Sequence, residues 1–342
     1  MRAVLFHEHG GLDKLRLEDV PIPDVGPDEV LVRVRACGVN RLDLLVREGR
    51  VGARVQLPHI SGSEVAGDVA RVGDRVAGVA ERQRVVVAPY LFCDRCEYCL
   101  AGDETLCLSG DIVGLTGNGG YAEYVAVPAR NLVPIPEDVS YDDAAAVTLA
   151  TLTAWHMLVE RARVKAGEDV LVLAAGSGVG SSAVQIAKLS GARVIATAGS
   201  EEKVKLALDL GADHAINYLE RDFLQEVRRI TGKRGVDVVV EHVGTDTWEK
   251  SVGCLARGGR LVICGTTSGA EGKTNLWQLF AKQLNLIGSY GGTRRELQTV
   301  LKLVADGRLR PVVDRSMPLE QAAEAQWLLQ ERRHFGKLIL NP

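Results

Sequence analysis

From about residue 169 onward, short apolar runs alternate with segments of helical periodicity, and this alternation restricts the possible folds more than any other feature. Val170 to Ala175 is continuously apolar, as expected for a strand buried on both faces. A helix with one apolar face is expected at 181–190, and further strands at 193–198, 236–240, 260–264 and 285–290. Parallel strands need crossover connections of this length. The pattern therefore predicts an α/β fold with a doubly wound parallel sheet.

The first part of the chain has a different pattern. Glu29 to Ala36 alternates valines with arginines, which is the period of two of a half-buried strand. A chain of 342 residues is long enough for two domains, since most domains have about 100 to 150 residues. We therefore expect a β-rich domain at 1–150 and an α/β domain at 151–290. The segment 291–342, with its strand-like Lys337 to Leu340, is expected to complete the first domain.

Composition and charge exclude several classes of protein. The chain is 46% hydrophobic and 25% charged, which is typical of a globular protein. Its 41 basic and 44 acidic residues are interspersed and form no basic stripe, so a nucleic-acid partner is not expected. The longest apolar stretch, Ala144 to Val159, is shorter than the ~20 residues of a membrane span. Charge follows the N-terminus too soon for a signal peptide, so we expect a cytoplasmic protein.

Four of the seven cysteines are clustered at C-x2-C-x2-C-x7-C spacing. Four thiolates in one loop can form a closed tetrahedral zinc site, which leaves no position open for a substrate. We therefore predict a structural zinc, with an iron–sulfur cluster as the chemical alternative. The predicted ligands are Cys93, Cys96, Cys99 and Cys107. The remaining cysteines lie in apolar surroundings and are expected to be small buried hydrophobic residues: Cys37, Cys254 and Cys264.

A glycine-rich loop joins the first α/β strand to its helix. Such a loop lets the backbone approach a pyrophosphate and directs N–H groups and the helix dipole at its charge. The spacing departs from the strict G-x-G-x-x-G, and a tight turn that merely needs glycine is the alternative. The predicted cofactor contacts in the loop are Gly176, Ser177, Gly178, Val179 and Gly180.

The end of the second α/β strand, at Ala198, bears on the choice of cofactor. A carboxylate at this place accepts the ribose hydroxyls of NAD. Here no carboxylate occurs before Glu201, and Ser200 and Lys203 would tolerate a 2′-phosphate. We therefore predict NADP(H) in preference to NAD(H), although Glu201 can still turn toward a ribose. Further predicted cofactor contacts are Gly244 and Gly265.

A nucleotide-type loop downstream of a four-cysteine segment resembles the medium-chain dehydrogenase/reductase superfamily of zinc alcohol dehydrogenases and quinone oxidoreductases. The resemblance extends over nearly the whole chain and includes 26–32, 119–124, 143–155, 235–238 and 334–337. It implies a GroES-like catalytic domain at 1–150 with a zinc lobe at about 90–110, completed by about 291–342. It also implies a Rossmann dinucleotide-binding domain at 151–290, an active site between the domains, and a homo-oligomer, either a dimer or a tetramer.

The sequence departs from this superfamily where zinc alcohol dehydrogenases hold a catalytic zinc. In place of the expected cysteine, histidine and second cysteine, it has Asn40, Ser63 and Leu149. Leu42 stands where the family has a hydroxyl residue that relays the proton. Because a catalytic zinc needs about three protein ligands, the comparison predicts an active site without one.

The segments 38–43 and 152–154 are similar to the quinone oxidoreductase branch of the superfamily. This implies hydride transfer between NAD(P)H and a small carbonyl, quinone or enone substrate. Asn40 is the candidate hydrogen-bond donor to developing oxyanion charge. Thr153 is expected to line the nicotinamide end of the site, and Ser63 or a water is expected to supply the proton.

Two other functions stay open from the sequence. The first is a zinc-dependent NAD(P) alcohol dehydrogenase with unusual ligands, drawn from Glu64, His59 and Cys37. The second is a nucleotide-binding regulator that keeps the fold and the cofactor but has lost turnover. If the site has no catalytic zinc, we expect Asp43 and Glu64 to be structural hydrogen-bond partners. We then expect His59 and His156 to be core or rim residues.

Overall fold

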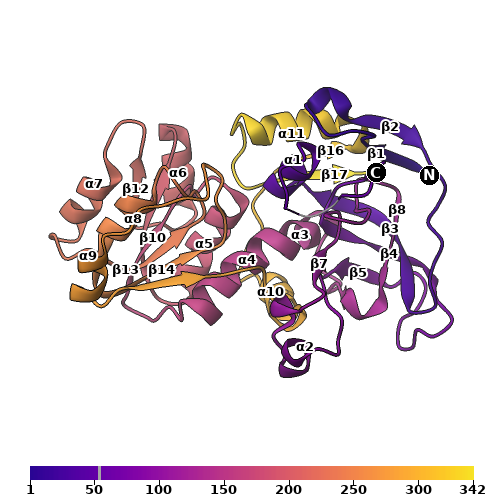
Figure 1. Cartoon of the computed structure of the whole chain (residues 1–342), viewed down its shortest axis with the longest axis horizontal. Coiled ribbons are helices and arrows are strands. Elements are labelled where there is room, and N and C mark those ends of the chain that lie inside the picture. Colours follow the sequence, from indigo (N-terminus) through magenta and orange to yellow (C-terminus); the bar gives the residue numbers. More distant parts are fainter. Residues whose placement is uncertain (53–54) are drawn as a thin grey trace. The chain divides into compact units, whose positions relative to one another are not determined.

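The structure, a computed structural model, describes residues 1–52 and 55–342. They form two compact units, one of Met1–Leu152 with Gly292–Pro342 and one of Thr153–Gly291. Figure 1 labels the elements of both units. Within the described residues, no helix is both long enough and apolar enough to cross a bilayer.

The second unit is built on a parallel sheet. In the described part of the chain it has six strands in the order β12-β11-β10-β13-β14-β15, and every neighbouring pair is parallel. Their bounds are β10 (Asp169–Val172), β11 (Arg193–Ala198), β12 (His214–Asn217), β13 (Val236–Glu241), β14 (Leu255–Ile263) and β15 (Asn285–Gly288). The predicted doubly wound parallel sheet is confirmed.

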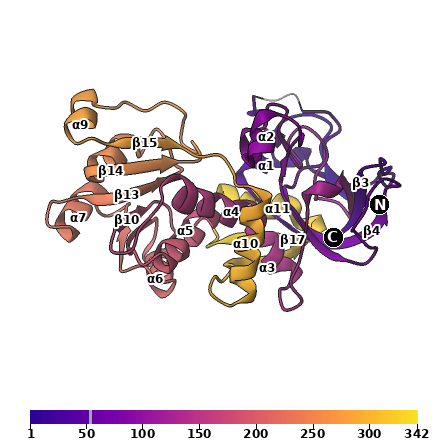
Figure 2. The ribbon, with the colours of Figure 1, turned by 90° about the horizontal axis from the view of Figure 1, so that it is seen from below.

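Helices connect these strands and lie beside the sheet (Figures 1 and 2). Their bounds are α5 (Gly178–Leu189), α6 (Glu201–Asp209), α7 (Phe223–Ile230), α8 (Trp248–Cys254) and α9 (Leu276–Ala281), preceded by the π-helical turn η5 (His156–Arg161). Helix α5 begins three residues earlier than the predicted helix, because Ser177 caps it by accepting a hydrogen bond from the Gly180 N–H at 2.9 Å. Gly178 and Gly180 of the loop are thus part of the helix start.

The first unit contains a mixed sheet in the order β16-β17-β3-β4-β5-β9, with β8 also paired to β3. The strands are β3 (Glu29–Gly38), β4 (Glu64–Val72), β5 (Arg84–Val87), β8 (Tyr124–Pro128), β9 (Leu132–Pro134), β16 (Val313–Pro318) and β17 (Lys337–Asn341). A hairpin of β1 (Arg2–Leu5) and β2 (Arg16–Asp19) lies outside it. The antiparallel pairing of β17 with β3 joins the end of the chain to its beginning.

Short helices and turns complete the first unit. They are η1 (Leu12–Lys14), α1 (Arg41–Arg47), η3 (Ala129–Asn131), α3 (Tyr141–Ala146), the π-helical turn η4 (Val147–Thr151), α10 (Arg294–Ala305), η6 (Leu319–Gln321) and α11 (Ala322–Gln330), while α4 (Leu152–Trp155) crosses the boundary between the units. A separate lobe contains β6 (Tyr90–Leu91), α2 (Glu97–Ala101), η2 (Glu104–Leu106) and β7 (Asp111–Ile112). The four clustered cysteines lie within this lobe.

Candidate functional site

One end of the β3–β4–β17 sheet brings together the candidate residues of the first unit. Gly38, the last residue of β3, is paired both with Glu64, the first residue of β4, and with Ile339 of β17. Asn40 therefore follows, and Ser63 precedes, the same end of a paired set of strands. Both are predicted catalytic residues, although their positions are 23 apart in the sequence.

Asn40 begins α1 and is held through its backbone. Its N–H donates to Asp43 Oδ2 at 2.7 Å, and the Tyr121 hydroxyl donates to the same oxygen at 2.9 Å. Asp43 and Tyr121 are completely buried. Burial raises the pKa of Asp43 to about 6, against the opposing effect of these hydrogen bonds. Asp43 thus fixes the backbone of Asn40, in agreement with the structural role expected for it.

The side chain of Asn40 is held by a lysine. Lys337 Nζ donates to Asn40 Oδ1 at 2.7 Å and to the Val39 carbonyl at 2.9 Å. The same ammonium lies 2.7 Å from Glu64 Oε2. Glu64 is completely buried and Lys337 is 5% exposed, so this is a buried ion pair.

Glu64 has a second set of partners in the π-helical turn η4. Its Oε1 accepts hydrogen bonds from the N–H groups of Leu149 at 3.1 Å and Ala150 at 2.9 Å. Leu149 is the residue that stands in place of the second cysteine ligand. The Glu64 carboxylate is therefore bonded to backbone amides and to an ammonium group.

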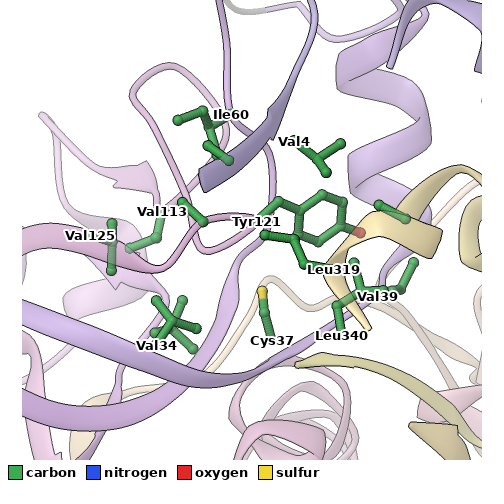
Figure 3. Close-up of a cluster of buried hydrophobic side chains, with 14 of the residues drawn as sticks. Val4, Val34, Cys37, Val39, Ile60, Val113, Tyr121, Val125, Leu319 and Leu340 are labelled. Atoms are coloured by element: carbon green, nitrogen blue, oxygen red, sulfur yellow. The ribbon is translucent and has the colours of Figure 1, made fainter. Parts of the chain in front are cut away.

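The other members of the alternative zinc set are also buried. The Cys37 thiol lies beside the Tyr121 ring within the hydrophobic core (Figure 3), and burial raises the pKa of this thiol well above its usual range. His59 Nε2 lies 3.0 Å from the Gly114 carbonyl oxygen, and burial lowers the pKa of the imidazole. His59 is thus a hydrogen-bonded core residue.

The two other predicted catalytic residues differ in their surroundings. Ser63 is completely buried, and its Oγ has no hydrogen-bond partner among the described residues. Thr153 is 8% exposed and belongs to α4 in the second unit, between the π-helical turns η4 and η5. Single-turn π-helical segments are frequent at functional sites.

The predicted cofactor loop lies where β10 leads into α5. Ala174 adopts φ 45°, and the Ser177 N–H donates to the Ala174 carbonyl at 2.9 Å, which closes a tight turn before α5. A Cβ on Gly180 would lie 2.2 Å from the Ala174 carbonyl oxygen, so only glycine fits at this position. The amides of Gly178 and Val179 belong to the first turn of α5, where helix amides lack an intrahelical acceptor. The loop therefore fits a pyrophosphate.

The remaining predicted cofactor residues follow the carboxyl ends of neighbouring strands in the same parallel sheet. Ser200 caps α6 after β11 by accepting from the Lys203 N–H at 3.2 Å. Gly244 follows β13, and Gly265 follows β14. Carboxyl ends of parallel strands share one edge, so these residues and the loop lie along a single edge of the sheet. Glu201 Oε1 accepts a hydrogen bond from Asn217 Nδ2 at 3.0 Å.

The sequence did not indicate how the loop at Gly244 is held. Glu241, the last residue of β13, is completely buried. Its Oε1 accepts from the N–H groups of Val243 at 2.7 Å and Gly244 at 3.1 Å, and its Oε2 accepts from Ser251 at 2.6 Å. Gly244 itself has φ +95°, and a Cβ would lie 2.3 Å from the Gly269 carbonyl oxygen.

The four cysteines of the lobe come together as predicted. Their sulfurs all lie within 4.8 Å of one another, with the Cys96–Cys99 pair at 3.5 Å and the Cys93–Cys99 pair at 3.9 Å. Tetrahedral zinc with Zn–S bonds of ~2.3 Å needs sulfurs about 3.8 Å apart, so this arrangement fits zinc. In the part of the chain that the structure describes, no other group of three or more His, Cys, Asp or Glu side chains is placed to hold a metal ion. Of the other cysteines, Cys264 is half-buried rather than buried.

Comparison with known proteins agrees with this geometry. Residues 26–137 match the family described as alcohol dehydrogenase GroES-like domain, and residues 178–306 match zinc-binding dehydrogenase. The chain is 34% identical to an NAD-dependent alcohol dehydrogenase of Sulfolobus acidocaldarius, over 99% of both chains. The chain belongs to the medium-chain dehydrogenase/reductase superfamily. It is also 32% identical to a quinone oxidoreductase of Rattus norvegicus, over 99% of this chain and 97% of the other.

A solved structure described as NAD-dependent alcohol dehydrogenase is similar over 100% of both chains, with a TM-score of 0.96 and 47% identity. As a member of this superfamily, the chain is an NAD(P)-dependent oxidoreductase with a GroES-like domain and a Rossmann-type sheet. This agrees with the expected enzyme and speaks against a regulator without turnover.

Proposed function

We propose that this chain catalyses hydride transfer between NAD(P)H and a small carbonyl, quinone or enone substrate, without a catalytic zinc. The observation that carries the proposal is the donor set at the end of the β3–β4–β17 sheet. Asn40, Ser63 and Leu149 replace the ligands of zinc alcohol dehydrogenases, and Glu64 is bonded to Lys337 and to two backbone amides. A carboxylate with these partners is a poor ligand for a further cation.

When bound, the nicotinamide supplies or accepts the hydride. The substrate oxygen that gains negative charge needs a hydrogen-bond donor, and the Asn40 Nδ2 group provides one. Its only donor contact given by the structure's described residues is the Gly38 carbonyl at 3.5 Å, at the limit of a hydrogen bond. Thr153 lines the nicotinamide end of the site, and Ser63 or a water supplies the proton.

We propose the edge of the parallel sheet as the dinucleotide site, with residues 151–290 as the cofactor domain and 1–150 with 291–342 as the catalytic domain. The amides of Gly178 and Val179 bind the pyrophosphate, aided by Gly176, Ser177 and Gly180. The loops at Gly244 and Gly265 lie along the same edge and contact the rest of the dinucleotide.

We also propose that NADP(H) is preferred to NAD(H). The end of β11 has no carboxylate, and Ser200 and Lys203 follow it within five residues. Glu201 is the nearest acid, and its carboxylate accepts a hydrogen bond from Asn217. The names of two similar proteins, both NAD-dependent alcohol dehydrogenases, do not support this preference. Fluorescence titration tests this preference: NADPH should bind more tightly than NADH, and Lys203→Ala should weaken the binding of NADPH alone. Much tighter binding of NADH than of NADPH would contradict it.

The cysteine lobe is proposed to hold a structural zinc through Cys93, Cys96, Cys99 and Cys107. The closed set of four thiolates supports a role in folding, because it leaves no position for a substrate. The lobe is also tied to α10, since Glu104 Oε2 accepts from the Arg294 N–H at 2.7 Å. Loss of the metal should therefore loosen this part of the first unit.

A homo-oligomer is proposed from the surface of the second unit. Leu276, Trp277 and Phe280 of α9 are 66–71% exposed. Figure 2 shows α9 beside β15, which forms an edge of the sheet. An apolar patch next to a free strand edge suits a second copy of the chain. Light scattering should give a multiple of 36.8 kDa, and Trp277→Asp should lower it. The cytoplasmic location stays a prediction.

A zinc-dependent alcohol dehydrogenase with unusual zinc ligands is the second candidate function. Two similar proteins are named NAD-dependent alcohol dehydrogenases, which favours alcohol as the substrate class. The activity test separates the two. Purified protein is assayed with NADPH and NADH against 9,10-phenanthrenequinone, cinnamaldehyde and benzaldehyde, with and without a chelator that removes exposed zinc. The proposal predicts reduction that resists the chelator and falls about 100- to 1000-fold in Asn40→Ala, as for loss of one oxyanion donor. Unchanged turnover in Asn40→Ala contradicts it.

A further inference from the structure

The ammonium group of Lys337 has three close oxygen neighbours. It donates hydrogen bonds to the Val39 carbonyl at 2.9 Å and to Asn40 Oδ1 at 2.7 Å, and it forms an ion pair with Glu64 Oε2 at 2.7 Å. The side chain is nearly completely buried. A lysine is expensive to bury unless it is paired and hydrogen-bonded, so these three contacts hold the Lys337 side chain in this position.

These contacts decide which end of the Asn40 amide faces Lys337. An ammonium group only donates hydrogen bonds, so it must meet the amide oxygen and not the amide nitrogen. Nδ2 is then directed away from Lys337, and its contact with the Gly38 carbonyl is long, at 3.5 Å. The lysine thus leaves the Asn40 N–H groups with unused donor capacity.

The same ammonium connects Asn40 to the π-helical turn η4. Glu64 binds Lys337 with Oε2 and binds the Leu149 and Ala150 amides with Oε1. Asn40 is fixed separately through its backbone N–H, which donates to Asp43. Backbone and side chain of Asn40 are therefore held by two different buried groups.

We propose that Lys337 is a positioning residue, which fixes the Asn40 amide with its N–H groups toward the substrate oxygen and strengthens them as donors. The positive charge on the amide oxygen polarises the amide in the direction that favours donation from Nδ2. The role in turnover rests on the proposed function of Asn40. The orientation of Asn40 does not, and it is tested separately.

The kinetic test is a double-mutant cycle. Lys337→Met leaves Glu64 buried without its partner, so it is combined with Glu64→Gln, and Glu64→Gln alone is the matched control. With Asn40 present, the Lys337→Met/Glu64→Gln protein should lose about 10- to 100-fold in kcat relative to Glu64→Gln, with the KM for NADPH little changed. In the Asn40→Ala background, the same change should cost less than about 2-fold, because coupled residues are not additive.

The second test needs no activity. Protein labelled with [15N]asparagine, without cofactor, gives the order parameter of the Asn40 side-chain NH2. We expect an order parameter of about 0.85, typical of a rigid group, in the wild type and in Glu64→Gln. In Lys337→Met/Glu64→Gln the order parameter should fall below about 0.6. A mobile Asn40 amide in the wild type overturns the proposal, and this result does not depend on whether a variant folds.

The outcomes separate the two proposals. If Asn40→Ala lowers kcat but the cost of Lys337→Met is the same with and without Asn40, Lys337 has no positioning role and the proposed function stands. If Asn40→Ala leaves kcat unchanged, the proposed function fails and so does the role of Lys337 in turnover. A rigid Asn40 amide that depends on Lys337 would then still support the orientation itself.

Discussion

The carboxylate of Glu64 accepts the backbone N–H of Ala150 at 2.9 Å, although the two residues are 86 positions apart. This bond joins the start of β4 to the π-helical turn η4, and the other oxygen of Glu64 joins both to Lys337. Three segments distant in sequence thus meet at one buried carboxylate. The site depends on this junction for its shape.

Glu64→Ala should therefore destabilise the protein strongly. It leaves the Lys337 ammonium buried without its carboxylate and removes the acceptor of two amides. Breaking a buried pair in this way costs about 3–5 kcal/mol. The measurement is the free energy of unfolding in urea. The Lys337→Met/Glu64→Gln protein, in which neither charge is left, should lose less, and a loss below about 1 kcal/mol in Glu64→Ala contradicts this account.

Two features of the site could not be predicted from the sequence: the position of Lys337 beside Asn40 and Glu64, and the π-helical turn η4. The alternation of strands and helices predicted the parallel sheet, because it depends on residues close together in the chain. Lys337 is the first residue of a predictable strand, but its burial depends on Glu64, 273 positions away. The π-helical turn has no sequence signal of its own. The predicted catalytic and cofactor residues stay predictions, whereas the four cysteines meet as their spacing indicated.

The titration of Asp43 should make the free energy of unfolding depend on pH. Its pKa is raised by burial from 3.8 to about 6, so the native state holds this proton more tightly than the unfolded state. Such a group stabilises the native state fully below about pH 4, and the contribution is lost as the pH rises through 6. At 1.36 kcal/mol per pKa unit, the difference is on the order of 3 kcal/mol.

Asp43→Asn tests this sign, since asparagine can still accept from the Asn40 N–H and the Tyr121 hydroxyl. Urea unfolding is measured between pH 4 and pH 7.5 for both proteins. The stability of the wild type relative to Asp43→Asn should fall as the pH rises from 4 to 6 and then level off. A relative stability that rises over this range would show that Asp43 is ionised in the native state throughout.

Gly180→Ala should disrupt the dinucleotide loop. Its Cβ would lie 2.2 Å from the Ala174 carbonyl oxygen, so the start of α5 must move away from β10. We expect at least about a 10-fold loss in affinity for NADPH, because the amides that meet the pyrophosphate are displaced. The control is Gly253→Ala in α8, where the new Cβ would be 3.4 Å from Leu224. Equal affinities for NADPH in the two variants would argue against a cofactor site at this loop.

The zinc content of the protein tests the central claim most directly. Wild type, Cys99→Ser and the control Cys254→Ala are loaded with zinc, washed with chelator and measured by mass spectrometry for zinc per chain. Cys254 is completely buried and outside the quartet. We predict one zinc in the wild type and in Cys254→Ala, and none in Cys99→Ser. Two zinc ions per wild-type chain, one of which survives in Cys99→Ser and is needed for turnover, would contradict an active site without catalytic zinc.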